Sequence, residues 1–154
     1  MQIEFEHLEH DPSDGLYYYE GQPFTGVLVR PLAPNFIQSE VHYVNGLPDG
    51  LTQVWRRPGC LAEESHFRCG VYHGTRTLWN DRGSLIAQEQ YERGVCVVRQ
   101  RWDDNGVLLE DFRISENDPQ YKWLTLFQEI DQLRASQEHQ NSHAGPGLCN
   151  DDDT

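Results

Sequence analysis

The chain lacks several features that would place it in a membrane, on nucleic acid or outside the cell. Apolar residues make up 37% of its 154 residues, and no run approaches the roughly 18 consecutive apolar residues of a membrane helix. The first 14 residues are acidic and lack the basic and apolar regions of a signal peptide, which predicts a cytoplasmic protein. Bases are also scarce: 12 stand against 25 acids, giving a formal net charge of −13. Because phosphate backbones and anionic lipids bind cationic surfaces, we expect no nucleic-acid and no membrane partner.

The motifs of common catalytic and metal sites are missing as well. There is no GxSxG, no HExxH, no phosphate-binding glycine loop before a helix and no CxxC pair. The adjacent carboxylates Glu63 and Glu64 point to opposite faces if they lie on a strand, so they are poorly placed to share one substrate. We therefore expect no catalytic residue, no metal site and no cofactor, and we interpret the protein as a non-enzyme.

What the chain does contain is an internal period of 24 residues. An aromatic residue recurs at Tyr19, Tyr43, Phe67 and Tyr91. Glycine recurs in two columns, at Gly46, Gly70 and Gly94 and at Gly26, Gly50 and Gly74. Tryptophan recurs at Trp55 and Trp79 and, one residue early, at Trp102. Because these columns keep step through three or four copies, the sequence predicts a repeat protein.

Each copy contains two stretches of strand character separated by turn residues. SEVHY, ESHFR and QEQYE alternate as strands with one buried face do, and RPGC, NDRGS and DDNGV are turns. The two glycines of VNGLPDG bracket a second tight reversal: we expect one in a left-handed conformation and the other to let an aromatic ring lie against bare backbone. Stacked copies predict a mainly β fold, an elongated single antiparallel sheet of about eight strands between Tyr17 and Ile114.

A helix and a tail follow the repeats. Asp118 is a candidate N-cap and Pro119 suits the first helical position. Apolar residues then recur at helical spacing, at Trp123, Leu126, Phe127, Ile130 and Leu133. We predict one C-terminal helix over 119–137 that caps the sheet within a single domain, residues 1–139, and a disordered acidic tail over 140–154.

Several columns together resemble the MORN-like repeat family, and most closely its bacterial branch of toxin–antitoxin antitoxins. The matching units are YVNGLPDGLTQVW with GCLAEE, and FRCGVYHGTRTLW with GSLIAQE, and YYYEGQPFTGV looks like the opening unit. The resemblance covers residues 17–114. Pro31 stands where the first copy should have tryptophan, and Val98 stands where the fourth should have its second glycine. The resemblance implies one β-hairpin per copy and an antitoxin or immunity role.

Candidate binding residues lie on the polar face of the predicted strands and beside its turns. The net charge exceeds the magnitude of roughly 2–8 that solubility needs in a small domain. Acidic groups around exposed aromatic rings suit a binder of a basic protein, although these carboxylates also fit a solvated face and the tryptophans also fit core packing. The candidate partner-binding residues are Glu40, His42, Trp55, Glu64, His66, Trp79, Trp102, Asp103, Asp104 and Asp111.

These observations lead to a hypothesis of an immunity protein or antitoxin that neutralises a cognate toxin, as a monomer or a simple heterodimer with that toxin. The resemblance implies the antitoxin role. The charge favours a basic nuclease (DNase) effector of a type VI secretion system, because a toxin that grips polyanions presents a cationic cleft. The alternative is a MORN-type scaffold that binds a helical partner protein or lipid, with lipid disfavoured by the charge. An enzyme with an unrecognised site is a third hypothesis.

Overall fold

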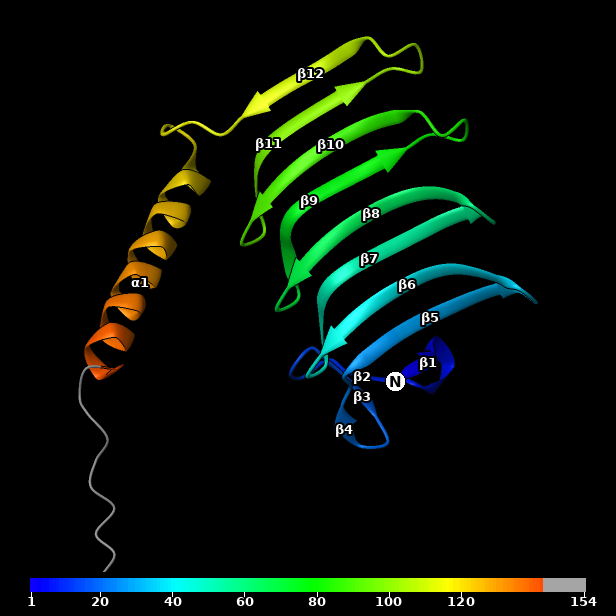
Figure 1. The fold of residues 1–154 in the computed structure, drawn as a ribbon, viewed down its shortest axis with the longest axis horizontal. Helices are drawn as coiled ribbons and strands as arrows, with labels where there is room; N and C mark the ends of the chain where they lie inside the picture. Colours follow the sequence, from blue (N-terminus) through cyan, green and yellow to red (C-terminus); the bar gives the residue numbers. More distant parts are fainter. Residues whose placement is uncertain (143–154) are drawn as a thin grey trace, which may run out of the picture. The chain divides into compact units, whose positions relative to one another are not determined.

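The computed structural model describes residues 1–142, with side chains described through residue 137. The chain divides into two compact units, one spanning Met1–Ile114 and the other beginning at Ser115. The predicted mainly β repeat unit is confirmed: eight antiparallel strands pair in sequence order and lie beside one another as curved ribbons (Figure 1). They are β5 (Gly26–Ala33), β6 (Phe36–Val44), β7 (Leu47–Arg57), β8 (Cys60–Arg68), β9 (Val71–Trp79), β10 (Leu85–Glu92), β11 (Val95–Trp102) and β12 (Leu108–Arg113).

The N-terminal residues add structure that the repeat pattern does not predict. β1 (Gln2–Glu4) pairs in parallel with β5, so the main sheet has nine strands and is mixed at this edge. A 3-10 turn (Phe5–His7) follows, and β2 (Glu9–Asp11), β3 (Leu16–Tyr19) and β4 (Gln22–Pro23) form a separate three-stranded sheet. The opening unit therefore lies in a small sheet of its own, and Phe24, which follows β4, belongs to the buried core.

The turn between copies has one repeated geometry. Both central residues have positive φ in Asn45–Gly46, in Cys69–Gly70 and in Arg93–Gly94. This is the type I′ hairpin turn, whose twist matches that of the flanking strands. Each turn glycine also donates its backbone N–H to the preceding copy, Gly46 to Phe24 O, Gly70 to Pro48 O and Gly94 to Tyr72 O, all at 2.8 Å.

The second glycine of each copy lies opposite the aromatic residue of the next strand. Gly50 pairs with Phe67 and Gly74 with Tyr91. The expected contact of a ring with bare backbone is not what these glycines provide, because an added Cβ would meet His42 Cβ or His66 Cβ and no ring. The sequence predicts that one of the two glycines in each copy is left-handed, but both are. Gly50 (φ 98°) and Gly74 (φ 95°) have positive φ, as the turn glycines do. The ladder shifts register at each of these sites, which accounts for the extra left-handed residue.

The core lies on the side of the sheet that carries the aromatic column, here called the aromatic face. Phe24, Leu28 and Tyr43 are its buried centre near the N-terminal end. Farther along, Tyr72 lies between two aromatic neighbours, with its ring centroid 4.5 Å from that of Phe67 and 4.9 Å from that of Tyr91. Aromatic rings thus supply the apolar area that short strands lack.

The second unit contains one helix, α1 (Pro119–Ser142), which begins where the sequence predicts and extends beyond the predicted end at Gln137. Asp118 caps it: its Oδ1 accepts the Gln120 backbone N–H at 2.9 Å. Of the predicted tail, residues 143–154 lie outside the described residues. Within the described part of the chain, no helix has the length and apolar character needed to cross a membrane.

Candidate functional site

The strand register places the predicted acidic positions in one row across the sheet. Each member lies directly opposite the next, from β6 to β12. Because side chains alternate between faces, all point away from the aromatic face. The row contains three carboxylates and no lysine or arginine. This polar row consists of Glu40, Gln53, Glu64, Thr77, Gln88, Gln100 and Asp111.

Amide side chains hold two of the three carboxylates. Gln53 Nε2 donates to Glu64 Oε2 at 2.8 Å, and Gln100 Nε2 donates to Asp111 Oδ1 at 3.3 Å. Glu40 has no such contact with any residue that the structure describes. A neutral amide leaves the charge of its carboxylate uncompensated, so the row carries the negative charge of all three acids.

His42 and His66 lie two residues beyond Glu40 and Glu64 on the same strands, and therefore on the same face. Both side chains are exposed. The Nδ1 atom of His66 lies 3.2 Å from the carbonyl oxygen of Thr75. The two histidines thus border the polar row on one side and are accessible to a partner.

The three tryptophans border the row on the other side. Trp55, Trp79 and Trp102 lie two residues beyond Gln53, Thr77 and Gln100, so alternation puts them on the polar face, and all are half-buried. The ladder shifts register at or beside each tryptophan, and such bulges redirect side chains. A half-buried ring both packs on the sheet and offers an accessible surface, so the two sequence interpretations of these tryptophans are compatible.

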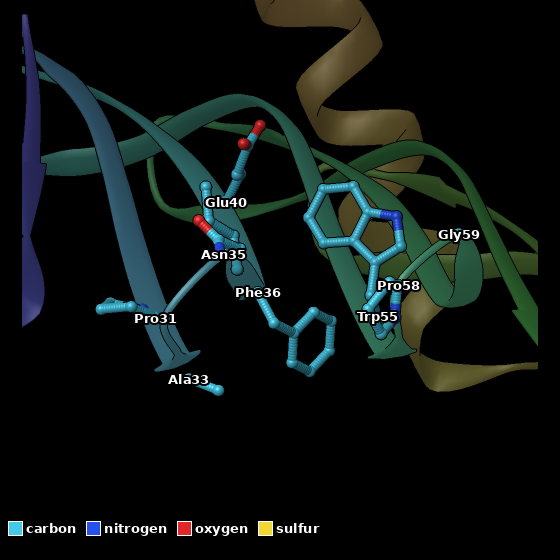
Figure 2. A pocket seen from close by; sticks show the side chains of 9 residues that line it. Pro31, Ala33, Asn35, Phe36, Glu40, Trp55, Pro58 and Gly59 are labelled. Carbon is cyan, nitrogen blue, oxygen red and sulfur yellow. The ribbon is translucent and has the colours of Figure 1, made fainter.

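A hollow of about 460 Å³ joins two of the predicted residues, Glu40 and Trp55. Figure 2 shows the Glu40 side chain and the Trp55 indole rising on the same side of neighbouring strands. The remaining lining comes from the β5–β6 hairpin and from the turn after β7. The lining residues are Pro31, Ala33, Asn35, Phe36, Ile37, Glu40, Trp55, Pro58 and Gly59.

No protein-family model, curated protein or solved structure matches this chain. The geometry and the charge of the site itself therefore have to indicate its function. Residues 17–114 hold 12 acidic and 10 basic side chains, whereas residues 1–16 hold five acidic side chains and no lysine or arginine. Most of the net charge thus lies outside the repeats, and within the sheet the polar row is a place where carboxylates occur without lysine or arginine.

Asp103 and Asp104 lie in the β11–β12 turn rather than in the polar row. Asp103 Oδ1 accepts the backbone N–H groups of Asn105 at 2.8 Å and Val107 at 2.9 Å, so this carboxylate stabilises the turn. Asp104 Oδ1 accepts the Asn80 Nδ2 amide at 2.9 Å, which joins two neighbouring turns. Asp104 also lines a second hollow, of about 400 Å³, together with Trp102.

The aromatic face carries a charged cluster that the sequence analysis missed. Glu89, which is 2% exposed, lies between Arg76 and Arg99 on adjacent strands, with N–O distances of 3.1 and 3.0 Å. Arg76 also pairs with Glu63 at 2.8 Å, and Arg101 pairs with Glu110 at 3.4 Å. The sequence could have revealed this cluster, because Glu63 and Glu89 lie an even number of positions before the recurring aromatic residues of their strands and so share their face.

The cluster holds Glu89 in its charged form. Burial alone would raise the pKa of the Glu89 carboxyl, but hydrogen bonds from Tyr91 and Arg76 and the charges of Arg76 and Arg99 outweigh it, leaving the pKa below its ordinary value. Hydrogen bonds to Glu63 raise the pKa of the Arg76 guanidinium. Arg76, Arg99 and Arg101 are therefore paired with carboxylates on the aromatic face, whereas the polar row keeps the negative charge of its three acids.

Proposed function

We propose that this chain is a cytoplasmic immunity protein that binds and neutralises a basic toxin through its polar face. The observation that carries the proposal is the polar row, in which three carboxylates occur without a cation. The resemblance of the repeats to MORN-like antitoxins supports the same role. The toxin class that fits is a nuclease effector of a type VI secretion system, whose cationic nucleic-acid cleft complements an acidic sheet face.

In the proposed mechanism the carboxylates and the tryptophans of this face have different roles. The carboxylates of Glu40, Glu64 and Asp111 attract the toxin's cationic cleft and speed association. The tryptophans bordering the row supply apolar anchors that slow dissociation. With the toxin's cleft covered by the sheet, its nucleic-acid substrate is excluded. The chain needs no chemistry of its own for this role.

The test is surface plasmon resonance against the product of the neighbouring gene, at about 0.05 M and about 0.3 M salt, since exposed charges are screened over about 10 Å at 0.1 M. Replacing Glu40, Glu64 and Asp111 with lysine should lower the association rate at least tenfold at low salt. The matched control replaces the exposed acids Glu6, Glu9 and Glu20 with lysine, which makes the same change in net charge elsewhere.

Equal losses in the two triple variants would show that net charge, and not the polar face, attracts the partner. Absence of binding to the neighbouring gene's product would refute the immunity role and favour the scaffold hypothesis. Toxicity assays in cells expressing both genes add an independent readout, because the polar-face variant should fail to protect while the control variant protects fully.

A further inference from the structure

The hollow beside Trp55 lies where the first copy departs from the repeat pattern. The position 24 residues before Trp55 is occupied by Pro31, which is much smaller than tryptophan and lines the hollow. Both flanking strands are irregular here, with register shifts on either side of Pro31 and of Trp55. The first copy thus lacks the tryptophan that recurs in the later copies, and the hollow lies between Pro31 at that position and Trp55 of the second copy.

The hollow combines apolar walls with a single uncompensated charge. Glu40 is the one ionisable residue among those that line it, and it has no ion-pair or hydrogen-bond partner among the described residues. Nearby arginines are engaged elsewhere. The Arg30 guanidinium lies 4.6 Å from the Phe5 ring centroid, and Arg56 pairs with Asp81 at 3.1 Å. A long cationic side chain from outside would therefore complement the hollow.

We propose that this hollow is a specific receptor for one arginine side chain of the partner protein. The guanidinium stacks on the accessible surface of the Trp55 indole and pairs with the Glu40 carboxylate, while its methylene groups contact Phe36 and Pro31. Arginine fits better than lysine because its planar cation both stacks on aromatic rings and forms two parallel hydrogen bonds to a carboxylate. The inference rests on the proposed function and names the anchor that the toxin contributes.

The first test uses small probes and no toxin. N-acetyl-L-argininamide is titrated into ¹⁵N-labelled protein, and the indole N–H signal of Trp55 is identified by its loss in W55F. We expect a saturable shift of that signal, with binding at least tenfold weaker for the neutral N-acetyl-L-citrullinamide and several-fold weaker for N-acetyl-L-lysinamide.

Three variants locate the effect. E40Q should weaken argininamide binding at least tenfold, whereas E64Q, which removes a carboxylate from the same row outside the hollow, should leave it unchanged. P31W restores the recurring ring and should abolish binding by filling the hollow. The E40Q and E64Q pair decides the question if P31W proves unable to fold.

The outcomes separate this inference from the proposed function. Equal binding of arginine and citrulline probes, no binding of either, or equal effects of E40Q and E64Q would overturn the arginine receptor. If the neighbouring gene's product binds E40Q and P31W as tightly as the parent, the receptor is wrong while the immunity role stands. If argininamide binds in a Glu40-dependent manner and that product does not bind, the receptor stands and the immunity role fails.

Discussion

Glu89 Oε2 lies 3.1 Å from Arg76 Nη1, and the Glu89 side chain is 2% exposed while that of Arg76 is 24% exposed. The acid is buried, whereas both of its arginine partners, Arg76 and Arg99, reach solvent. Removing the acid would leave Arg76 and Arg99 facing each other across a poorly hydrated site, without the charge that separates them. Breaking this cluster by removing its acid is therefore costly, because it leaves two cations without their shared counter-charge.

Replacing Glu89 with glutamine should lower the free energy of unfolding by about 3 kcal/mol, the lower end of the cost of breaking a buried ion pair by removing one partner. Urea denaturation followed by tryptophan fluorescence measures this. E64Q is the control, because it makes the same chemical change on the polar face and should alter stability by less than about 1 kcal/mol. Equal losses would mean that the buried cluster has no special role.

Acid should weaken the fold through the same residue. The folded-state pKa of Glu89 is below its ordinary value of 4.5, so its contribution is fully present above pH 4.5 and disappears as the pH falls through the lowered value. The free energy of unfolding of the parent should therefore fall more steeply than that of E89Q between about pH 5 and about pH 3. Parallel curves for the two proteins would contradict this assignment.

Gly50→Val and Gly74→Val should each cost roughly 1–3 kcal/mol of stability. Space is not the reason, because an added Cβ would meet only His42 Cβ or His66 Cβ at an ordinary 3.6 Å. The reason is the positive φ, which a β-branched residue strongly resists. Thr77→Val is the control, since it places valine at a regular strand position. Thermal melting that ranks T77V with the glycine variants would refute the backbone argument.

Truncating a tryptophan beside the polar row should act on dissociation. Trp79→Ala is expected to raise the dissociation rate from the neighbouring gene's product and to weaken binding by about 2 kcal/mol, with little change in association rate. Trp123→Ala, in the helix, is the matched control and should leave both rates unchanged. A loss confined to the association rate would show that the ring does not anchor the partner.

The repeat period was enough to predict the hairpins, because the aromatic and glycine columns specify strands and turns locally. It also located Glu40, Glu64 and Asp111 on one face, since alternation along a strand needs no tertiary information. Strand β1 could not be predicted in this way, because three residues without alternation become a strand only by pairing with β5. The hollow likewise depends on two bulges, and bulges are decided by neighbouring strands rather than by the local sequence.

The backbone bonds from Gly46, Gly70 and Gly94 each reach back by the same distance along the chain, and each joins one copy only to the copy before it. If a whole 24-residue unit were duplicated or lost, the copies on either side could therefore form the same backbone hydrogen bond with their new neighbours. Related chains could thus gain or lose one hairpin at a time. The length of the polar face would then change to match the width of a partner's cleft, while the contacts between neighbouring copies stayed the same.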